Sequence, residues 1–171
     1  THLIHLQFFI SKNKNQNYKK KNKIIIRRVI KKCLKDNLFL IFFSTSSADR
    51  NINDYTNSKK ICEKEINKFS RNKKLKYLIL RIYNVYSTDL DSRGVIPDFV
   101  NKIKSKKRLS ISFSENVRDF IYMDDLLELI RKSTNLKKSM KIQVGTGKGT
   151  KISLLAKKIQ NKFNPHCEIA F

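Results

Sequence analysis

Glycine is scarce in this sequence, and none of it occurs early. The chain of 171 residues contains four glycines, and the first of them is Gly94. A glycine-rich turn that would hold a dinucleotide phosphate at the start of a helix is therefore absent from the first half of the chain. Gly145 and Gly147 come late and lack the G-x-G-x-x-G spacing, so we interpret them as part of a tight turn.

Acidic residues are also few. The chain contains 14 Asp and Glu residues and 38 Lys and Arg residues, which gives a net charge of +24. Such a charge suits nucleic-acid binding, which would weaken steeply as salt rises. The lysines are, however, spread along the chain, and the densest tract, residues 12–23, contains no arginine- or glycine-rich repeat. We therefore favour a basic solvated surface on a globular protein, rank nucleic-acid binding last, and do not expect nucleic acid as a partner.

The cysteines lack the spacing of a metal site or a redox pair. Cys33, Cys62 and Cys167 form no C-x-x-C pair and no ligand pattern with the histidines, so we expect no metal and reduced thiols in a cytoplasmic protein. The apolar run over residues 38–43 is far too short to span a bilayer, and no signal-peptide pattern is present. We therefore expect no membrane partner.

Apolar runs alternate with amphipathic stretches in the first half of the chain. This alternation predicts strands over residues 3–6, 38–43 and 75–83 and helices over 18–35 and 55–69, with Asn37 ending the first helix. Such an order is typical of an α/β fold with a parallel sheet.

The pattern changes after Asn84. We expect a helix over 97–106, strands over 109–113 and 120–123, a helix that Asp124 caps and that ends near residue 133, a strand over 141–144, and a closing helix capped by Thr150 or Ser153. We therefore expect the chain to divide into two regions, residues 1–86 and 87–171. The strand over 141–145 belongs either to the second region or to the sheet of the first.

Tyr55 and Lys59 carry the main chemical signal. Positions i and i+4 share one face of a helix, so the phenol and the ammonium can point into one pocket. A nearby cation favours the phenolate and lowers the pKa of a tyrosine, which would make Tyr55 an acid/base near neutral pH. Ser46, nine residues earlier, can hold the oxygen that gains or loses the proton. The three groups suit the interconversion of an alcohol and a ketone by hydride transfer, although any solvated helix can show the same spacing.

Five short sequence strings, one of which contains Tyr55 and Lys59, occur in the chain in a characteristic order. They are LIHL at 3–6, YTNSK at 55–59, LRIYNVY at 80–86, RDFIYMDD at 118–125 and VGTGKGT at 144–150. With them the chain resembles the NAD-dependent epimerase/dehydratase family, the extended short-chain dehydrogenase/reductases, and looks most like the nucleotide-sugar epimerases and reductases. The resemblance implies a partial Rossmann-type parallel sheet with a small C-terminal substrate-binding region, the cofactor NAD or NADP, a nucleotide-diphosphate sugar as substrate, and a homodimer through helices 18–35 and 55–69.

The resemblance also implies roles for single residues. Ser46, with Thr45 as the alternative, Tyr55 and Lys59 would be catalytic. Leu6, Asn22 and Tyr83 would join Tyr55 and Lys59 around the cofactor, and Asn84 and Arg118 would bind the substrate diphosphate. Each of the added residues has a structural alternative: a solvated helix residue for Asn22, a core tyrosine for Tyr83, a cap for Asn84 and a surface ion pair for Arg118.

The sequence departs from the family in three places. The glycine-rich turn is missing, so we expect the first strands to be absent, Thr1 to lie just before the fourth strand, and the chain to be a fragment or a diverged copy with weakened NAD binding. Gln7 and Phe8 are bulky where the family has small residues beside the cofactor, and the Ser46–Tyr55 connection is short. We expect an epimerase or reductase rather than a dehydratase. The alternative is an inactive relative that binds a nucleotide sugar.

Overall fold

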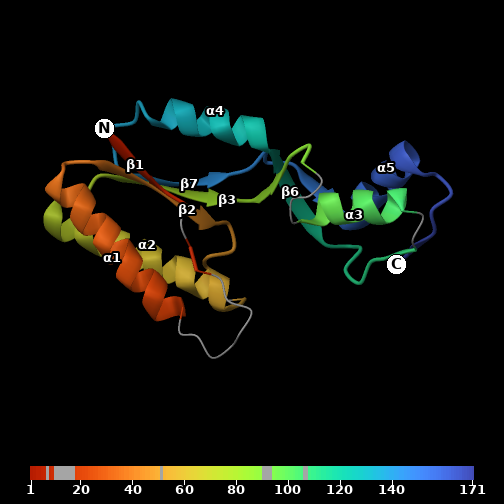
Figure 1. Cartoon of the computed structure of the whole chain (residues 1–171), viewed down its shortest axis with the longest axis horizontal. Helices are drawn as coiled ribbons and strands as arrows, with labels where there is room; N and C mark the ends of the chain where they lie inside the picture. The colour runs from red at the N-terminus through yellow and green to blue at the C-terminus, as the bar shows by residue number, and fades with distance from the viewer. Residues whose placement is uncertain (7, 10–17, 51, 90–93, 106–107) are drawn as a thin grey trace. The chain divides into compact units, whose positions relative to one another are not determined.

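A computed structural model describes residues 1–6, 8–9, 18–50, 52–89, 94–105 and 108–171 of the chain (Figure 1). The chain divides into two compact units. The first contains Thr1–Ile82 and Arg131–Val144, and the second contains Tyr83–Ile130 and Gly145–Phe171. Each unit is therefore made of two segments that alternate along the chain. Gln7, one of the two bulky residues noted above, lies outside the described residues.

The first unit is built on a parallel sheet of four strands. They are β1 (His2–His5), β2 (Phe39–Thr45), β3 (Tyr77–Ile82) and β7 (Met140–Val144), in the spatial order β1-β2-β3-β7. Leu40, Ile41 and Phe42 of β2 have no exposed surface, which explains why this strand is apolar without alternation. The predicted parallel α/β sheet is confirmed.

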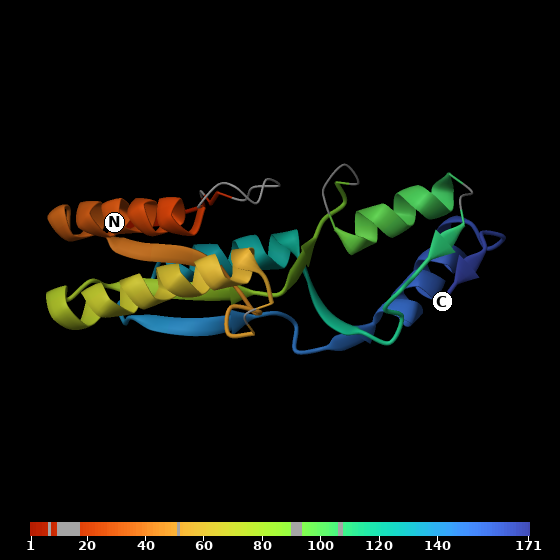
Figure 2. The same cartoon turned by 90° about the horizontal axis from the view of Figure 1, so that it is seen from below.

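Two helices, α1 (Tyr18–Lys35) and α2 (Asp54–Lys73), lie side by side on one face of this sheet (Figure 1, Figure 2). Their apolar faces meet β2 and β3 in one core cluster, which includes Ile26 and Ile30 of α1 and Cys62 and Ile66 of α2. Burial of this kind contributes about 25 cal/mol per Å² of apolar surface and is what holds the helices to the sheet.

The ends of both helices follow from their sequences. Asn37 has a φ of 52° just beyond α1 and ends it, as predicted. Asn53 caps α2: its side chain accepts the Thr56 N–H, and the Thr56 hydroxyl accepts the Asn53 N–H. Tyr55 consequently lies in a well-fixed first helical turn.

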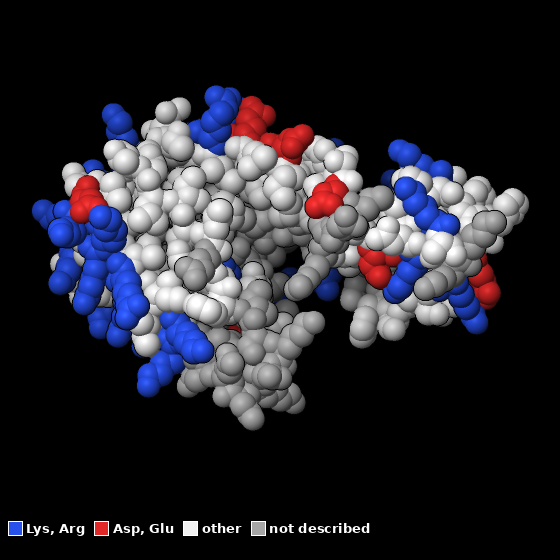
Figure 3. Space-filling view, in the orientation of Figure 1, with Lys and Arg blue, Asp and Glu red and all other residues white. Residues whose placement is uncertain are grey.

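The first unit also carries much of the positive charge. Figure 3 shows lysine and arginine side chains gathered over α1, at positions that face solvent. Arg27 and Lys23 of this helix pair with Glu65 of α2, with N–O distances of 2.7 and 3.3 Å. These two contacts tie the helices together across their solvent side.

The second unit combines short strands with helices. Parallel β4 (Asn84–Tyr86) and β6 (Val117–Tyr122) pair, and β8 (Gly149–Lys151) joins β6 antiparallel. β5 (Leu109–Ser110) pairs with β9 (Ile169–Ala170). The helices are α3 (Val95–Lys104), α4 (Met123–Ser133), whose last turn belongs to the first unit, and α5 (Ile152–Phe163). Phe99, Ile103, Leu109, Ala156 and Ile159 are among the residues of its core.

Two capping predictions in this region are wrong. Helix α4 begins at Met123 directly after β6, so Asp124 lies inside its first turn. Helix α5 follows β8 without a loop, which places Thr150 in the strand and Ser153 in the helix, and the N-cap residue Lys151 makes no side-chain cap bond. A strand that runs straight into a helix leaves no position for a separate cap residue.

The cysteines, the apolar character of the helices and the grouping of possible metal ligands can be described for the observed structure. Cys33, Cys62 and Cys167 are buried and form no disulfide. Within the described ranges, no helix has both the length and the apolar character needed to cross a membrane. In that same part of the chain, no group of three or more His, Cys, Asp or Glu is placed to hold a metal ion.

Candidate functional site

Tyr55 and Lys59 lie on successive turns of α2, beside the carboxyl end of β2. The side chain of Lys59 is buried, and its Nζ donates a hydrogen bond to the Phe43 carbonyl oxygen at 2.6 Å. The same Nζ is 5.7 Å from the centre of the Tyr55 ring. The structure thus brings together the two residues that their spacing singled out.

Aromatic rings enclose this pair. The ring centre of Phe8 lies 3.8 Å from Lys59 Nζ, and the Phe8 ring meets the Tyr55 ring edge-on at 5.6 Å. Phe42 lies on another side, with its ring centre 5.1 Å from the same Nζ, and His5 stacks on Phe42. Phe8 therefore occupies the space over both candidate catalytic side chains, in line with the crowding expected from its size.

The enclosure changes how the groups ionise. Burial lowers the pKa of Lys59 to about 8 and raises the pKa of Tyr55. Burial, and then repulsion by Lys59, lowers the pKa of His5. The prediction that Lys59 lowers the pKa of Tyr55 is wrong for this arrangement, because loss of water around the phenol raises the pKa. The hydroxyl group of Tyr55 is consequently protonated at neutral pH in this state.

Asn22 of α1 holds the backbone that follows β1. It is 3% exposed, accepts the Phe9 N–H at 2.9 Å, and donates to the Phe9 carbonyl at 3.0 Å and to Ser58 Oγ of α2 at 3.0 Å. A solvated helix position is thereby excluded for Asn22. Its two bonds to Phe9 fix the neighbouring Phe8 over the Tyr55–Lys59 pair.

The hydroxyl groups after β2 have different surroundings. Ser44 is buried and donates to Glu63, and the Thr45 hydroxyl accepts the Ser47 N–H at 3.4 Å. Ser46 is half-buried in the turn that follows β2, and its N–H donates to the Ile82 carbonyl at 3.1 Å. Among the contacts of the described residues, none joins Ser46 to Tyr55.

Leu6 is 68% exposed immediately beyond β1, within the first unit. The remaining predicted site residues, Tyr83, Asn84 and Arg118, belong to the second unit. Tyr83 is 38% exposed, and Arg118 is exposed on β6 opposite Thr150. Asn84 Nδ2 donates to the Asp119 carbonyl at 2.9 Å, which gives this amide a structural partner.

The predicted tight turn at Gly145–Gly147 is observed, and Asp119 holds it. One carboxylate oxygen of Asp119 accepts the N–H and the hydroxyl of Thr146, at 2.9 and 2.7 Å, and the other accepts the Gly147 N–H at 2.8 Å. A Cβ on Gly145 would lie 2.5 Å from Asp119 Oδ2, and Gly147 has a φ of 74°. The sequence analysis missed this role of Asp119.

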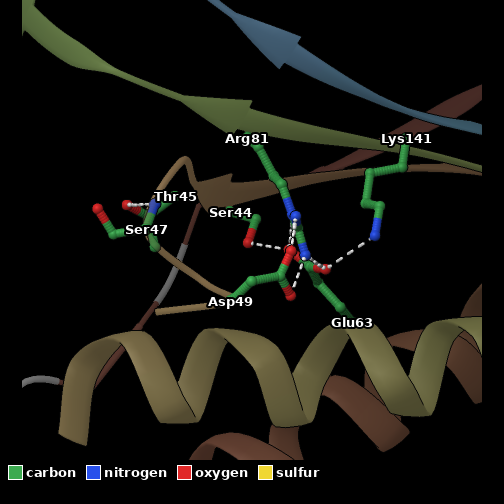
Figure 4. Close-up of polar contacts among 7 residues, drawn as sticks. All are labelled: Ser44, Thr45, Ser47, Asp49, Glu63, Arg81 and Lys141. Atoms are coloured by element: carbon green, nitrogen blue, oxygen red, sulfur yellow. Dashed lines mark hydrogen bonds and ion pairs between the residues drawn. The ribbon is translucent and has the colours of Figure 1, made fainter. Parts of the chain in front are cut away.

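A buried ionic cluster was also missed (Figure 4). Arg81 of β3 donates to Glu63 of α2 at 2.7 Å and to Asp49 of the loop after β2. Hydrogen bonds to Glu63 and Asp49 raise the pKa of Arg81, and the bond from Arg81 lowers the pKa of Asp49. A signal was available, because arginine inside an apolar strand such as LILRI is normally buried only when it is paired.

Comparisons with known proteins agree with the fold. The chain is similar to UDP-N-acetylglucosamine 4-epimerase from Methanobrevibacter ruminantium (TM-score 0.86, 23% identity, 99% of this chain and 62% of that one). It is also similar to UDP-glucose 4-epimerase from Thermotoga maritima (0.83, 23%, 98% and 63%) and to the Thermus thermophilus enzyme in complex with NAD (0.79, 19%, 99% and 64%).

The chain thus spans less than two thirds of each of these structures, and at such identities the likeness establishes the Rossmann-type fold. A comparison with curated proteins finds no significant match. The model of the NAD dependent epimerase/dehydratase family matches residues 2–145. The chain therefore belongs to the NAD dependent epimerase/dehydratase family.

Proposed function

We propose that the protein is an NAD(P)-dependent epimerase or reductase of a nucleotide-diphosphate sugar. Family membership supports the reaction class, and the proteins of similar structure include enzymes named for UDP-sugars. The observation that carries the proposal is the Tyr55–Lys59 pair, a phenol and a buried ammonium on successive turns of one helix at the carboxyl end of the sheet. Ligands bind at that end of open parallel sheets.

Tyr55 would move the proton in this reaction. Its hydroxyl group, protonated at neutral pH, can donate to a sugar carbonyl oxygen, and the phenolate that forms can recover the proton in the reverse direction. Lys59 would stabilise the phenolate that forms, and the Ser46 hydroxyl would hold the reacting oxygen. A bound nicotinamide would supply the hydride acceptor and donor.

The residues present fit one end of NAD. The Lys59 ammonium and the Tyr55 hydroxyl are suitable donors for the nicotinamide ribose, once the Phe8 ring moves from its place over them. The pyrophosphate needs a different segment, because no glycine precedes Gly94. Leu6, Asn22 and Tyr83 would complete the nicotinamide end, with Asn22 acting through the backbone of Phe9.

Arg118 and Asn84 would bind the substrate diphosphate. An exposed guanidinium can pair with two phosphate oxygens at once. A cytoplasmic location and a homodimer through α1 and α2 complete the proposal. Three buried cysteines that form no disulfide agree with a reducing compartment.

A second candidate is an inactive relative that binds a nucleotide sugar without converting it. The position of Phe8 favours this candidate, because the ring covers both Tyr55 and Lys59. Two binding measurements and one turnover measurement separate the two functions.

The test uses the full-length protein, with calorimetry for NAD and UDP-sugar binding and a chromatographic assay for sugar conversion. We expect turnover, and we expect Tyr55→Phe to reduce it by about 100-fold or more, as for loss of a general acid. Tyr77→Phe in β3 is the matched control and should keep the wild-type rate. UDP-sugar binding without conversion would establish the inactive relative, and full activity of Tyr55→Phe would refute the assignment of this residue.

A further inference from the structure

We infer that Asp49, Glu63 and Arg81 form a clamp that positions the loop bearing Ser46 against helix α2. The inference rests on the proposed function for the roles of Ser46, Tyr55 and Lys59. The clamp itself is a property of the first unit, and it can be tested without any turnover.

Arg81 is the centre of the clamp (Figure 4). Its side chain leaves β3 and reaches α2, where Nε and Nη2 donate to the two oxygens of Glu63 at 3.0 and 2.7 Å. Nη2 also donates to Asp49 Oδ1 at 3.0 Å, and Nη1 donates to Asp49 Oδ2. One guanidinium therefore bridges two carboxylates that come from a helix and from a loop.

Glu63 also contacts polar side chains of the sheet. It accepts the hydroxyl of Ser44 from β2, and Lys141 Nζ from β7 lies 3.7 Å from Oε2. The side chains of Glu63 and Arg81 are 4% and 6% exposed, so solvent screens their interaction little. Two cations, Arg81 and Lys141, therefore lie beside the Glu63 carboxylate, and Arg81 also binds the Asp49 carboxylate.

The clamp joins the two elements that carry the candidate catalytic groups. Asp49 lies three residues after Ser46, in a turn where the Ala48 N–H donates to the Thr45 carbonyl. Glu63 lies one helical turn after Lys59 on α2. Because both carboxylates hold the same guanidinium, a movement of the loop relative to α2 has to break a bond to Arg81.

Asp49 is the residue at which the clamp can be opened selectively. Its side chain is 63% exposed, whereas Glu63 and Arg81 are core residues whose replacement endangers the fold. In Asp49→Asn the shape is kept, whereas the negative charge and one of the two oxygens that accept from Arg81 are lost. Asp36→Asn is the matched control, because Asp36 is also paired with one cation, Lys32, and belongs to the same unit.

The first measurement is amide hydrogen exchange on the full-length protein. We expect the Ala48 and Arg50 amides, whose bonds close the turn, to exchange about tenfold faster in Asp49→Asn, since an opened loop exposes them. The β3 amides should not change, and neither Asp36→Asn nor the longer carboxylate of Asp49→Glu should speed exchange to this extent. Unchanged exchange at Ala48 and Arg50 in Asp49→Asn would overturn the clamp.

The second measurement separates positioning from folding. In Asp49→Asn we expect kcat to fall about tenfold with KM unchanged, and we expect Asp49→Glu to recover most of the rate. Faster exchange together with an unaltered kcat would overturn the role in positioning. A wild-type protein without turnover would refute the proposed function, and the exchange result would still decide whether the clamp exists.

Discussion

The ring of Phe8 lies directly over the ammonium of Lys59, with 3.8 Å between Nζ and the ring centre. This is a cation–π contact, and it also keeps water from a charged group inside the protein. Tyr55 is covered by the same ring. A single aromatic side chain therefore covers both members of the pair and contributes to their burial.

Replacing Phe8 should change the ionisation of Lys59. In Phe8→Ala water reaches the ammonium, and the pKa of Lys59 should rise from about 8 toward its ordinary value of 10.5, because burial is the main cause of the lowering. The measurement is an NMR titration of the Lys59 side chain. Phe9→Ala is the control, since this neighbouring ring lies near Lys21 and is 41% exposed. A further fall of the pKa in Phe8→Ala would show that the cation–π contact dominates.

Lys59 should cost the protein stability at neutral pH. Its pKa in the folded state is below the ordinary 10.5, so the unfolded chain binds more protons between pH 8 and 10.5, and the free energy of unfolding rises with pH in that window. The difference between the two pKa values of Lys59 corresponds to on the order of 3 kcal/mol in the free energy of unfolding. Lys59→Met removes this cost and loses one hydrogen bond worth about 1 kcal/mol.

We therefore expect Lys59→Met to be more stable than the wild type at pH 7 by about 2 kcal/mol, with the advantage disappearing toward pH 10.5. Urea denaturation across this range measures it. A mutant that is less stable at pH 7 and follows the same pH dependence as the wild type would contradict the assignment of the low pKa.

The stability of the protein should fall more when one member of the Glu63–Arg81 pair is removed than when both are removed. Glu63→Gln leaves the Arg81 charge buried without its main counter-charge, which costs about 3–5 kcal/mol. The double variant Glu63→Gln/Arg81→Met removes both charges and should recover part of that loss. The exposed pair Lys102–Asp98 serves as control, and Lys102→Ala should cost less than about 1 kcal/mol. Equal costs for Glu63→Gln and Lys102→Ala in chemical denaturation would rule out a special role for the buried pair.

Asp119 should make the second unit sensitive to acid. Burial alone would raise its pKa, but hydrogen bonds from Thr146 and Gly147 outweigh burial and lower it. Stability from a group with a lowered pKa is present above its ordinary value of 3.8 and is lost as the pH falls through the folded-state pKa.

Asp119→Asn should therefore lower the free energy of unfolding by about 1 kcal/mol at pH 6, with allowance for solvent screening, and by less at pH 3. Thermal unfolding at the two pH values measures the difference, and Asp98→Asn on α3 is the control. A deficit that stays constant between pH 6 and pH 3 would exclude the ionised carboxylate as its cause.

The sheet and its helices could be predicted because their signals are local. Helix α1 repeats apolar residues at helical spacing and stops at Asn37, and both of its bounds agree with the expectation of 18–35. β2 and β3 read as continuous apolar runs because they are buried in the middle of a parallel sheet. Strands of two or three residues, such as β8 and β9, are too short to show any period, and the strand expected over 109–113 is shorter in the structure, at Leu109–Ser110.

The site was partly accessible from the sequence for a similar reason. Tyr55 and Lys59 are one helical turn apart, so a spacing rule finds them. The contact of Phe8 with Lys59 and that of Glu63 with Arg81 join segments far apart in the chain, and no local pattern encodes them. The direction of the Tyr55 pKa was missed because it depends on how much water the fold removes.

The alternation of the two units along the chain has a consequence for biosynthesis. β3 ends at Ile82, and its neighbour β7 begins at Met140, after residues 83–130 of the second unit have been made. On the ribosome, the outer edge of β3 therefore waits unpaired for several seconds at ordinary elongation rates of about 5–20 residues per second. Nascent chains of this protein should need protection during that interval, and synonymous codons that slow translation between β3 and β7 should lower the yield of folded protein.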